Sequence, residues 1–199
     1  MQPIPKLIIV GRDGILNEFR ADHIKAPEEW VAVPGALEAL CRLNHAGWHV
    51  VVATNQSGIG RGMIDMSAVN AVHAHMMRSL QTLGGRIDAV FFCPHAPEFE
   101  CACRKPLPGL MLDIGRRYGV ELGEVPMVGD TLRDLQAAQA AGCEPHLVRS
   151  GRAASLSAAE VADMVRQVPG TVVHRDLGEL ATHLLERAHR RASQSGALD

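Results

Sequence analysis

Short runs of consecutive apolar residues recur along this chain of 199 residues, and helix-like stretches separate most of them. A run that is apolar at every position is typical of a strand buried on both faces, because a strand with one solvated face alternates apolar and polar residues. Six segments that are wholly or mostly apolar are expected to be strands, the last at an edge of the sheet: residues 7–10, 49–54, 89–93, 126–128, 146–148 and 171–174.

Helix-forming segments lie between and after these runs. We expect helices at residues 34–45, 67–83 (with Ser67 as N-cap), 109–118, 132–141 and from 177 onward. Strands that alternate with helices predict an α/β fold, a doubly wound, Rossmann-like parallel sheet with helices on both faces. The stretch between the first two strands is too short for a large cap domain. We therefore expect a single domain over residues 1–190 and a disordered polar tail at 191–199.

Composition limits the classes of partner. The chain is 47% hydrophobic and 21% charged, with a net charge of −2, which is typical of a globular protein and not of a nucleic-acid or membrane-surface binder. No apolar run approaches the roughly 18–20 residues of a membrane span, and the N-terminus lacks the layout of a secretory signal. We expect a cytoplasmic monomer that binds neither nucleic acid nor membrane.

Polar clusters follow four of the predicted structural segments, at residues 11–14, 54–58, 104–106 and 129–131. Ligands of open parallel sheets bind beyond the carboxyl ends of the strands, so one fold would bring these clusters to one crevice. Together they offer a hydroxyl, backbone amides, a lysine, an arginine and two carboxylates. These groups suit a phosphate and Mg²⁺, which prefers oxygen ligands. Taken singly, residues 54–58 are equally typical of a polar turn, and Gly129 with Asp130 is more typical of a turn that ends a strand than of a functional site.

Three of the five cysteines fall within eleven residues. Cys93 and His95 are followed after five residues by Cys101 and Cys103, which gives three thiolates and one imidazole. This is the ligand set of a closed, tetrahedral structural zinc site, and its work would be to fold the loop 93–103. The alternative is a set of reduced thiols with a histidine nearby by chance.

Four motifs carry a family resemblance: RDGILN at 12–17, TNQSGIGRG at 54–62, CPH with CACRKPLPG between 93 and 109, and VGDTLRDLQAA at 128–138. From about residue 7 to 151 the chain resembles the haloacid dehalogenase-like phosphatases. The resemblance implies a Mg²⁺-dependent phosphoric monoester hydrolase acting on a small sugar phosphate. TNQSG and the zinc segment resemble the branch that removes the 7-phosphate of heptose 1,7-bisphosphates for lipopolysaccharide core synthesis. Histidinol phosphate is the alternative substrate.

The resemblance assigns roles to individual residues. The family's motif after the first strand is Asp-x-Asp, in which the first Asp attacks phosphorus and the second is the general acid and base; Asp13 matches the second. Asp130 would carry Mg²⁺ together with the backbone carbonyl of Asp13. Asp134 is either a support for this site or an exposed helix residue. The remaining roles are phosphoryl stabilisation, by Thr54 and Lys105, and substrate binding, by Asn55, Gln56, Ser57 and Arg104.

The nucleophile's position in this alignment holds Gly11. Loss of a covalent nucleophile typically costs about 10⁶-fold in turnover, so we expect an inactive or strongly impaired chain. Three explanations are open. Gly11 is an engineered, recent or erroneous change in an active enzyme, or it marks a degenerate copy that only binds sugar phosphate. In the third, Asp13 or water carries out a slower reaction. Because the other site residues are intact, we favour the first. A local alternative is that glycine permits a tight exit from the strand.

Overall fold

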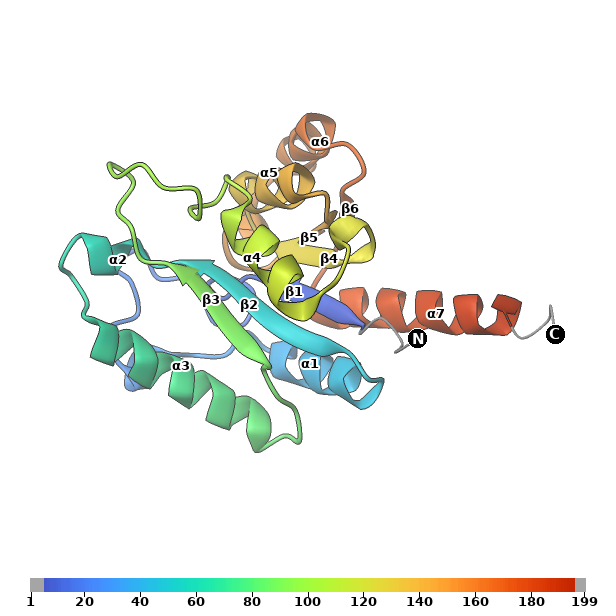
Figure 1. The fold of residues 1–199 in the computed structure, drawn as a ribbon, viewed down its shortest axis with the longest axis horizontal. Helices are drawn as coiled ribbons and strands as arrows, with labels where there is room; N and C mark the ends of the chain where they lie inside the picture. The colour runs from blue at the N-terminus through green and yellow to red at the C-terminus, as the bar shows by residue number, and fades with distance from the viewer. Residues whose placement is uncertain (1–5, 196–199) are drawn as a thin grey trace.

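The computed structural model describes residues 6–195, which form a sheet of parallel strands flanked by helices (Figure 1). Within these residues the sheet has six strands in the order β3-β2-β1-β4-β5-β6, and every neighbouring pair is parallel. The strands are β1 (Leu7–Val10), β2 (His49–Asn55), β3 (Ala89–Cys93), β4 (Pro126–Gly129), β5 (Glu144–Val148) and β6 (Val172–His174). The expected doubly wound α/β fold is confirmed.

Helices cover both faces of the sheet. They are α1 (Ala36–His45), α2 (Ser57–Gly60), α3 (Met66–Gln81), α4 (Gly109–Tyr118), α5 (Leu132–Ala141), α6 (Ala158–Gln167) and α7 (Leu177–Ser195), with short 3₁₀ turns at Pro27–Glu29, Leu122–Glu124 and Gly151–Ser155. The helices α1, α3 and α7 share a core with one face, and α4 and α5 share a core with the other (Figure 1). No helix within residues 6–195 is long and apolar enough to cross a membrane.

The two cores explain why β1 is apolar at every position. Its side chains alternate between the faces, so that Ile8 and Val10 join the core under α1, α3 and α7, whereas Leu7 and Ile9 join the core under α4 and α5. All four are buried. A polar residue at any of these positions would lose its contact with water, which explains why a two-sided sheet selects a continuous apolar run.

Several expected boundaries are corrected. Helix α3 begins at Met66, because the side chain of Asp65 accepts a hydrogen bond from Ala68 N (2.7 Å); Asp65, not Ser67, is the N-cap. The expected tail is wrong over 191–195, where α7 continues to Ser195, and residues 196–199 lie outside the described chain. Helix α6 was missed, although Ser157 and Glu160 form a capping box at its start.

The strand order reverses beside β1, which pairs with β2 on one side and β4 on the other. The residues that follow these strands therefore meet at one crevice, as the sequence predicts. A hydrogen bond from Gly11 N to Val128 O (2.9 Å) extends the pairing one residue past β1 and brings the end of β1 against β4.

A buried histidine pair joins β5 to β6 at the far side of the sheet. The Nδ1 atom of His146 lies 3.0 Å from Nε2 of His174, and the His183 ring of α7 lies 5.3 Å from the His174 ring. Burial, with the neighbouring His146 and His183, lowers the pKa of His174 to about 4. The native fold therefore requires a neutral His174.

This arrangement predicts an acid-sensitive contribution to stability. The pKa of His174 is lower in the folded chain than in the unfolded chain, so the unfolded chain binds more protons between about pH 6.5 and pH 4. The stabilisation is complete above pH 6.5 and is lost as the pH falls towards 4. We expect His174→Gln to weaken the dependence of the free energy of unfolding on pH in this window. Urea titrations at pH 7, 5.5 and 4.5 measure it, with the exposed His189→Gln as control; parallel pH profiles for both variants would contradict the prediction.

Candidate active site and metal centre

The predicted site residues meet in a cavity at the carboxyl ends of β1, β2 and β4. The residues that line it are Gly11, Arg12, Asp13, Thr54, Asn55, Lys105, Asp130, Thr131, Arg133, Asp134 and Arg152. The ends of the strands therefore bring the predicted catalytic residues together. Of the predicted substrate-binding residues, Asn55 lines the cavity, whereas Gln56, Ser57 and Arg104 lie outside its lining.

The carboxylate of Asp13 lies at the centre of a hydrogen-bond network. Arg12 donates to Oδ1 from Nη2 (2.8 Å) and Nε (3.2 Å), and Asn17 Nδ2 donates to the same oxygen (3.1 Å). Oδ2 accepts from Gln56 Nε2 (3.0 Å) and lies 3.5 Å from the Thr54 hydroxyl. Burial by itself raises the pKa of Asp13, but Arg12 and these donors outweigh it and hold the pKa below its usual value. Asp13 is therefore ionised at neutral pH.

Arg12 is buried behind Asp13, and its Nη1 lies 3.2 Å from Nε2 of His73. Burial and the Arg12 charge lower the pKa of His73 to about 4, so this imidazole is neutral and accepts a hydrogen bond from the guanidinium. The sequence alone assigned no role to Arg12 or His73. The structure shows that both fix the orientation of the predicted acid–base residue.

Gly11 is not required by the backbone. It is absent from the glycines with positive φ, so an L-amino acid can adopt its conformation. A Cβ atom at this position would lie 3.1 Å from Cγ1 of Ile15 and 3.5 Å from Val128 O. A side chain therefore fits if Ile15 moves by a few tenths of an ångström. The alternative that glycine permits a tight strand exit therefore rests on the close approach of Ile15 and not on the backbone conformation.

Lys105 is a buried cation with two fixed partners. Its Nζ lies 2.6 Å from Oδ1 of Asp134 and donates to Ala53 O (2.8 Å). Burial opposes ionisation of Asp134, but Lys105 and Thr131 lower the pKa of this carboxyl below its usual value. Asp134 is therefore an ionised support for Lys105 and not an exposed helix residue.

The side chains of Asn55 and Gln56 hydrogen-bond to other residues of the site. Asn55 Nδ2 donates to Lys105 O (3.1 Å), and Asn55 Oδ1 accepts from Lys105 N (3.1 Å), so one amide clamps both backbone groups of the lysine. Gln56 Nε2 donates to Thr54 Oγ1 (2.9 Å) as well as to Asp13. Ser57 begins the short helix α2.

Asp130 is a buried carboxylate on the β4 side. Its Oδ2 accepts from Arg152 N (2.8 Å), and its Oδ1 lies 3.5 Å from Nη1 of Arg152. Burial first, and the Asp134 charge second, raise the pKa of Asp130 to about 6. The backbone approaches closely here: a Cβ on Gly14, whose φ is +83°, would lie 2.1 Å from Asp130 Oδ2. Because burial disfavours the charged form of the Asp130 carboxyl, a cation beside it would stabilise the ionised carboxylate.

Arg152 and Arg133 also belong to the cavity, and sequence reasoning missed both. Arg152 lies shortly after the end of β5 and comes after Ser150 and Gly151 in the chain. Its guanidinium lies 3.6 Å from the centre of the Phe19 ring. The rule that ligands bind beyond strand ends, applied to the fifth strand as well, would have found Arg152. Arg133 lies in the first turn of α5, where no such rule points to it.

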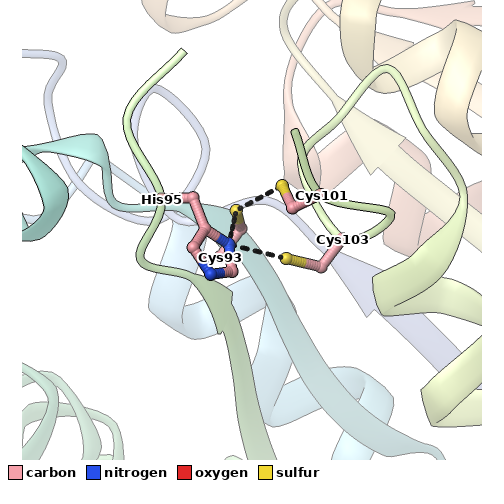
Figure 2. Close-up of side chains that lie close together, drawn as sticks. All are labelled: Cys93, His95, Cys101 and Cys103. Carbon is pink, nitrogen blue, oxygen red and sulfur yellow. Dashed lines mark hydrogen bonds between the residues drawn. The ribbon is translucent and has the colours of Figure 1, made fainter. Parts of the chain in front are cut away.

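The four predicted zinc ligands converge in the loop after β3 (Figure 2). Their ligand atoms all lie within 4.8 Å of one another. A tetrahedral zinc ion with Zn–S near 2.3 Å and Zn–N near 2.0–2.1 Å requires sulfur–sulfur separations of about 3.8 Å and sulfur–nitrogen separations of about 3.6 Å. Cys93 and Cys101 sulfurs are 3.8 Å apart, and His95 Nδ1 lies 3.5 Å from Cys93 Sγ and 3.3 Å from Cys103 Sγ. The cluster therefore fits a tetrahedral metal.

Backbone contacts join this cluster to the cavity. Cys93 O accepts from Gln56 N (2.8 Å), and Pro94 O accepts from Gly60 N (2.8 Å), so the loop rests on α2. Arg104 donates from Nη1 to His95 O (3.3 Å) and lines a groove outside the cavity. The cluster thus sets the path of the chain into Lys105.

Two family models match the chain. The model of the HAD-hydrolase-like family matches residues 102–180, and the model of the polynucleotide kinase 3 phosphatase family matches residues 14–136. Together the matched ranges cover residues 14–180, which include the cysteine cluster and every cavity residue except Gly11, Arg12 and Asp13.

Relatives match nearly the whole chain. The D-glycero-beta-D-manno-heptose-1,7-bisphosphate 7-phosphatase of Bordetella bronchiseptica is 50% identical over 92% of this chain and 99% of its own length. The protein of that name from Pseudomonas aeruginosa is 41% identical over 90% of this chain and 98% of its own length.

Two solved structures also align with nearly the whole chain. The D,D-heptose 1,7-bisphosphate phosphatase of B. bronchiseptica, complexed with magnesium and phosphate, aligns with a TM-score of 0.84 over 92% of this chain and 99% of that chain, at 50% identity. The enzyme of that name from Burkholderia thailandensis aligns with a TM-score of 0.67 over 90% of this chain and 98% of that chain, at 43% identity. The chain therefore belongs to the haloacid dehalogenase-like phosphatases, in the family of the D-glycero-β-D-manno-heptose-1,7-bisphosphate 7-phosphatases.

Proposed function

We propose that this fold is built to remove the 7-phosphate of D-glycero-β-D-manno-heptose 1,7-bisphosphate, and that Gly11 leaves the present chain strongly impaired. The observation that carries the proposal is the cavity in which Asp13, Thr54, Lys105 and Asp130 meet. An ionised acid–base residue, a hydroxyl, a buried ammonium and a buried carboxylate at one point are what transfer of a phosphoryl group requires.

Each residue has a separate task. The Thr54 hydroxyl and Lys105 Nζ stabilise negative charge on the phosphoryl oxygens, and Asp13 exchanges a proton with the leaving oxygen or with the attacking water. Because Arg12 keeps Asp13 ionised, Asp13 is better suited in this chain to take a proton from water than to donate one. Residual turnover would then use water, or the Asp13 carboxylate itself, as the attacking group, without the nucleophile that a carboxylate at position 11 supplies.

Magnesium fits the oxygen donors beside Asp130. We assign it to the Asp130 carboxylate and the backbone carbonyl of Asp13; when bound, it supplies positive charge to the oxygens of the transferring group. The elevated pKa of Asp130 supports this assignment, because a nearby cation would relieve the cost of ionising that buried carboxyl. Arg152 supplies part of that charge when no metal is present.

We assign zinc to Cys93, His95, Cys101 and Cys103. Burial, and then the neighbouring thiols, raise the pKa of Cys103 to about 12 when no metal is present, so three close thiols gain from a cation that replaces their protons. With four protein ligands the site has no open position for catalysis. Its role is to hold the loop that delivers Arg104 and Lys105.

The setting that fits this chemistry is the cytoplasm, where thiols stay reduced and sugar phosphates are made. The described cysteines are all free, which supports that proposal. We further propose that the protein acts as a monomer, because one chain supplies every residue of the cavity. The expected pathway is heptose supply for lipopolysaccharide core. A sugar-phosphate-binding protein without catalysis is the second candidate, which Gly11 favours.

The first prediction concerns Gly11. We expect Gly11→Asp to hydrolyse the heptose bisphosphate at least about 10³-fold faster than the chain as given, because it restores a carboxylate nucleophile. Gly11→Asn is the matched control, since it has the same shape but no nucleophilic carboxylate, and it should remain as slow as the glycine chain. Phosphate release on heptose bisphosphate and on histidinol phosphate measures both activity and substrate choice. Equal turnover by all three proteins would require another nucleophile.

The second prediction concerns the metal cluster. We expect about one zinc per chain by elemental analysis, and a large loss of zinc in Cys101→Ser. Cys41→Ser, at a cysteine outside the cluster, is the control and should retain the metal. Hydrogen exchange should rise over residues 93–108 after chelation, while the sheet remains protected. A folded protein with free thiols and no zinc would refute the assignment.

The third prediction concerns binding without turnover. Inorganic phosphate should bind the chain as given, because Thr54 and Lys105 are unaltered, and Mg²⁺ should tighten it while phosphate tightens Mg²⁺. The pKa of Asp130 is raised to about 6, so protons compete with Mg²⁺ and metal affinity should fall as the pH drops below 6. Calorimetric titration at pH 7.5 and 5.5 tests both effects, and Asp130→Asn should remove the coupling. Absence of binding at millimolar phosphate would mean that the cradle is not formed.

A further inference from the structure

The two oxygens of the Asp13 carboxylate have different partners. Oδ1 accepts three hydrogen bonds, two from Arg12 and one from Asn17 Nδ2, whereas Oδ2 accepts one from Gln56. Because a carboxylate oxygen offers about two lone-pair positions, Oδ1 has no capacity left. Oδ2 is also the oxygen beside Thr54, at 3.5 Å from its hydroxyl, and Thr54 lines the cavity. Oδ2 is therefore the oxygen that is free to act on a group in the cavity.

Arg12 decides which oxygen is occupied. Its side chain is only 2% exposed, so the guanidinium has lost water and needs acceptors inside the protein. Nε and Nη2 both point to Oδ1 of Asp13, and Nη1 lies 3.2 Å from Nε2 of His73 on α3. The position of the carboxylate therefore depends on an acceptor 61 residues away in the chain, because that acceptor holds the other end of the guanidinium.

His73 suits this task because it is a neutral acceptor in a fixed place. A guanidinium only donates hydrogen bonds, so the contact forms only when Nε2 of His73 carries no proton, which places the ring proton on Nδ1. A neutral ring satisfies Nη1 without attracting the charge of Arg12 away from Asp13, as a second carboxylate would. The imidazole is buried, and the Phe92 ring of β3 lies 5.7 Å from it.

We infer that His73 is a positioning residue for the reaction: through Arg12 it holds Asp13 so that Oδ2 faces the transferred phosphoryl group and exchanges the proton. This inference deepens the proposed function and rests on it. Within residues 6–195, His73 is not among the residues that line the cavity, and it therefore does not touch the phosphate. Its loss should lower kcat and leave KM and phosphate affinity almost unchanged.

The ring of His73 can be observed directly in the chain as it exists. Nitrogen NMR of the ¹⁵N-histidine-labelled protein at pH 7.5 should show a neutral histidine with its proton on Nδ1 and an unprotonated Nε2. That signal should disappear in His73→Gln, which assigns it. A His73 ring with its proton on Nε2 would overturn the inference, because Arg12 could then not donate to it.

Kinetics in the Gly11→Asp background measure the effect on the reaction. His73→Leu should lower kcat for the heptose bisphosphate by about 10²-fold, because a displacement of about 1 Å at a reacting group has a cost of that size. KM should stay within about 3-fold. His73→Gln keeps an amide oxygen that can accept from Arg12, so it should recover about 10-fold of the lost kcat. His75→Leu is the control, since His75 lies on the same helix but packs edge-on against Trp30.

Binding separates a displaced Asp13 from a damaged fold. In the chain as given, His73→Leu should bind inorganic phosphate within about 2-fold of the parent by calorimetry. An unchanged kcat in His73→Leu, an equal loss of kcat in His73→Gln, or a loss that falls mainly on KM or on phosphate binding would each overturn the inference. If Gly11→Asp itself hydrolyses no phosphate ester, the proposed function fails and this inference with it, which is seen in the parent and not in the His73 variants.

Discussion

The buried ion pair between Lys105 and Asp134 is the contact on which the cavity depends. It joins the loop after the cysteine cluster to α5, two segments that approach the cavity from different parts of the chain. Removing one partner of such a pair typically costs about 3–5 kcal/mol, because the other charge stays buried without compensation. Asn55 adds a second constraint by holding the backbone of Lys105 against β2. The ammonium of Lys105, to which we assign phosphoryl binding, is therefore fixed before any ligand arrives, which is the condition for electrostatic preorganisation.

The change at position 11 stands out against this background. Around it, the acid–base residue, the ammonium and the carboxylate of Asp130 each have an intact partner, and the backbone of Gly11 has a conformation open to any residue. A chain that had drifted for long without catalysis should also have lost such buried charges, since a buried ion pair is often no more stabilising than apolar residues of similar volume. These contacts agree with our proposal that one residue separates binding from catalysis, because the groups to which we assign phosphate binding keep their partners.

The strands and the position of the cavity could be predicted because their signals are local: continuous apolar runs, and polar clusters directly after them. The cysteine cluster could be predicted because metal geometry restricts ligand spacing. Contacts between distant segments could not. The Arg12–His73 contact joins residues 61 positions apart, and no local sequence pattern around either residue predicts it. The TNQSG motif led us to expect that Asn55 binds the substrate, whereas its side chain hydrogen-bonds to the backbone of Lys105. Helix α6 was missed even though its capping box is readable at 157–160, so that omission was avoidable.

The position of Cys93 at the end of β3 has a consequence for how the protein would fail. β3 is an edge of the sheet, pairs only with β2 among the described strands, and ends in a ligand of the cysteine cluster. Open edges are where foreign strands add, and proteins guard them with short strands or covering segments. A cation bound in the cluster, as we propose, would therefore fasten the exposed margin of the sheet as well as shape the loop. When zinc is scarce, we therefore expect aggregation through the β3 edge to appear first, in molecules whose hydrophobic core is still folded.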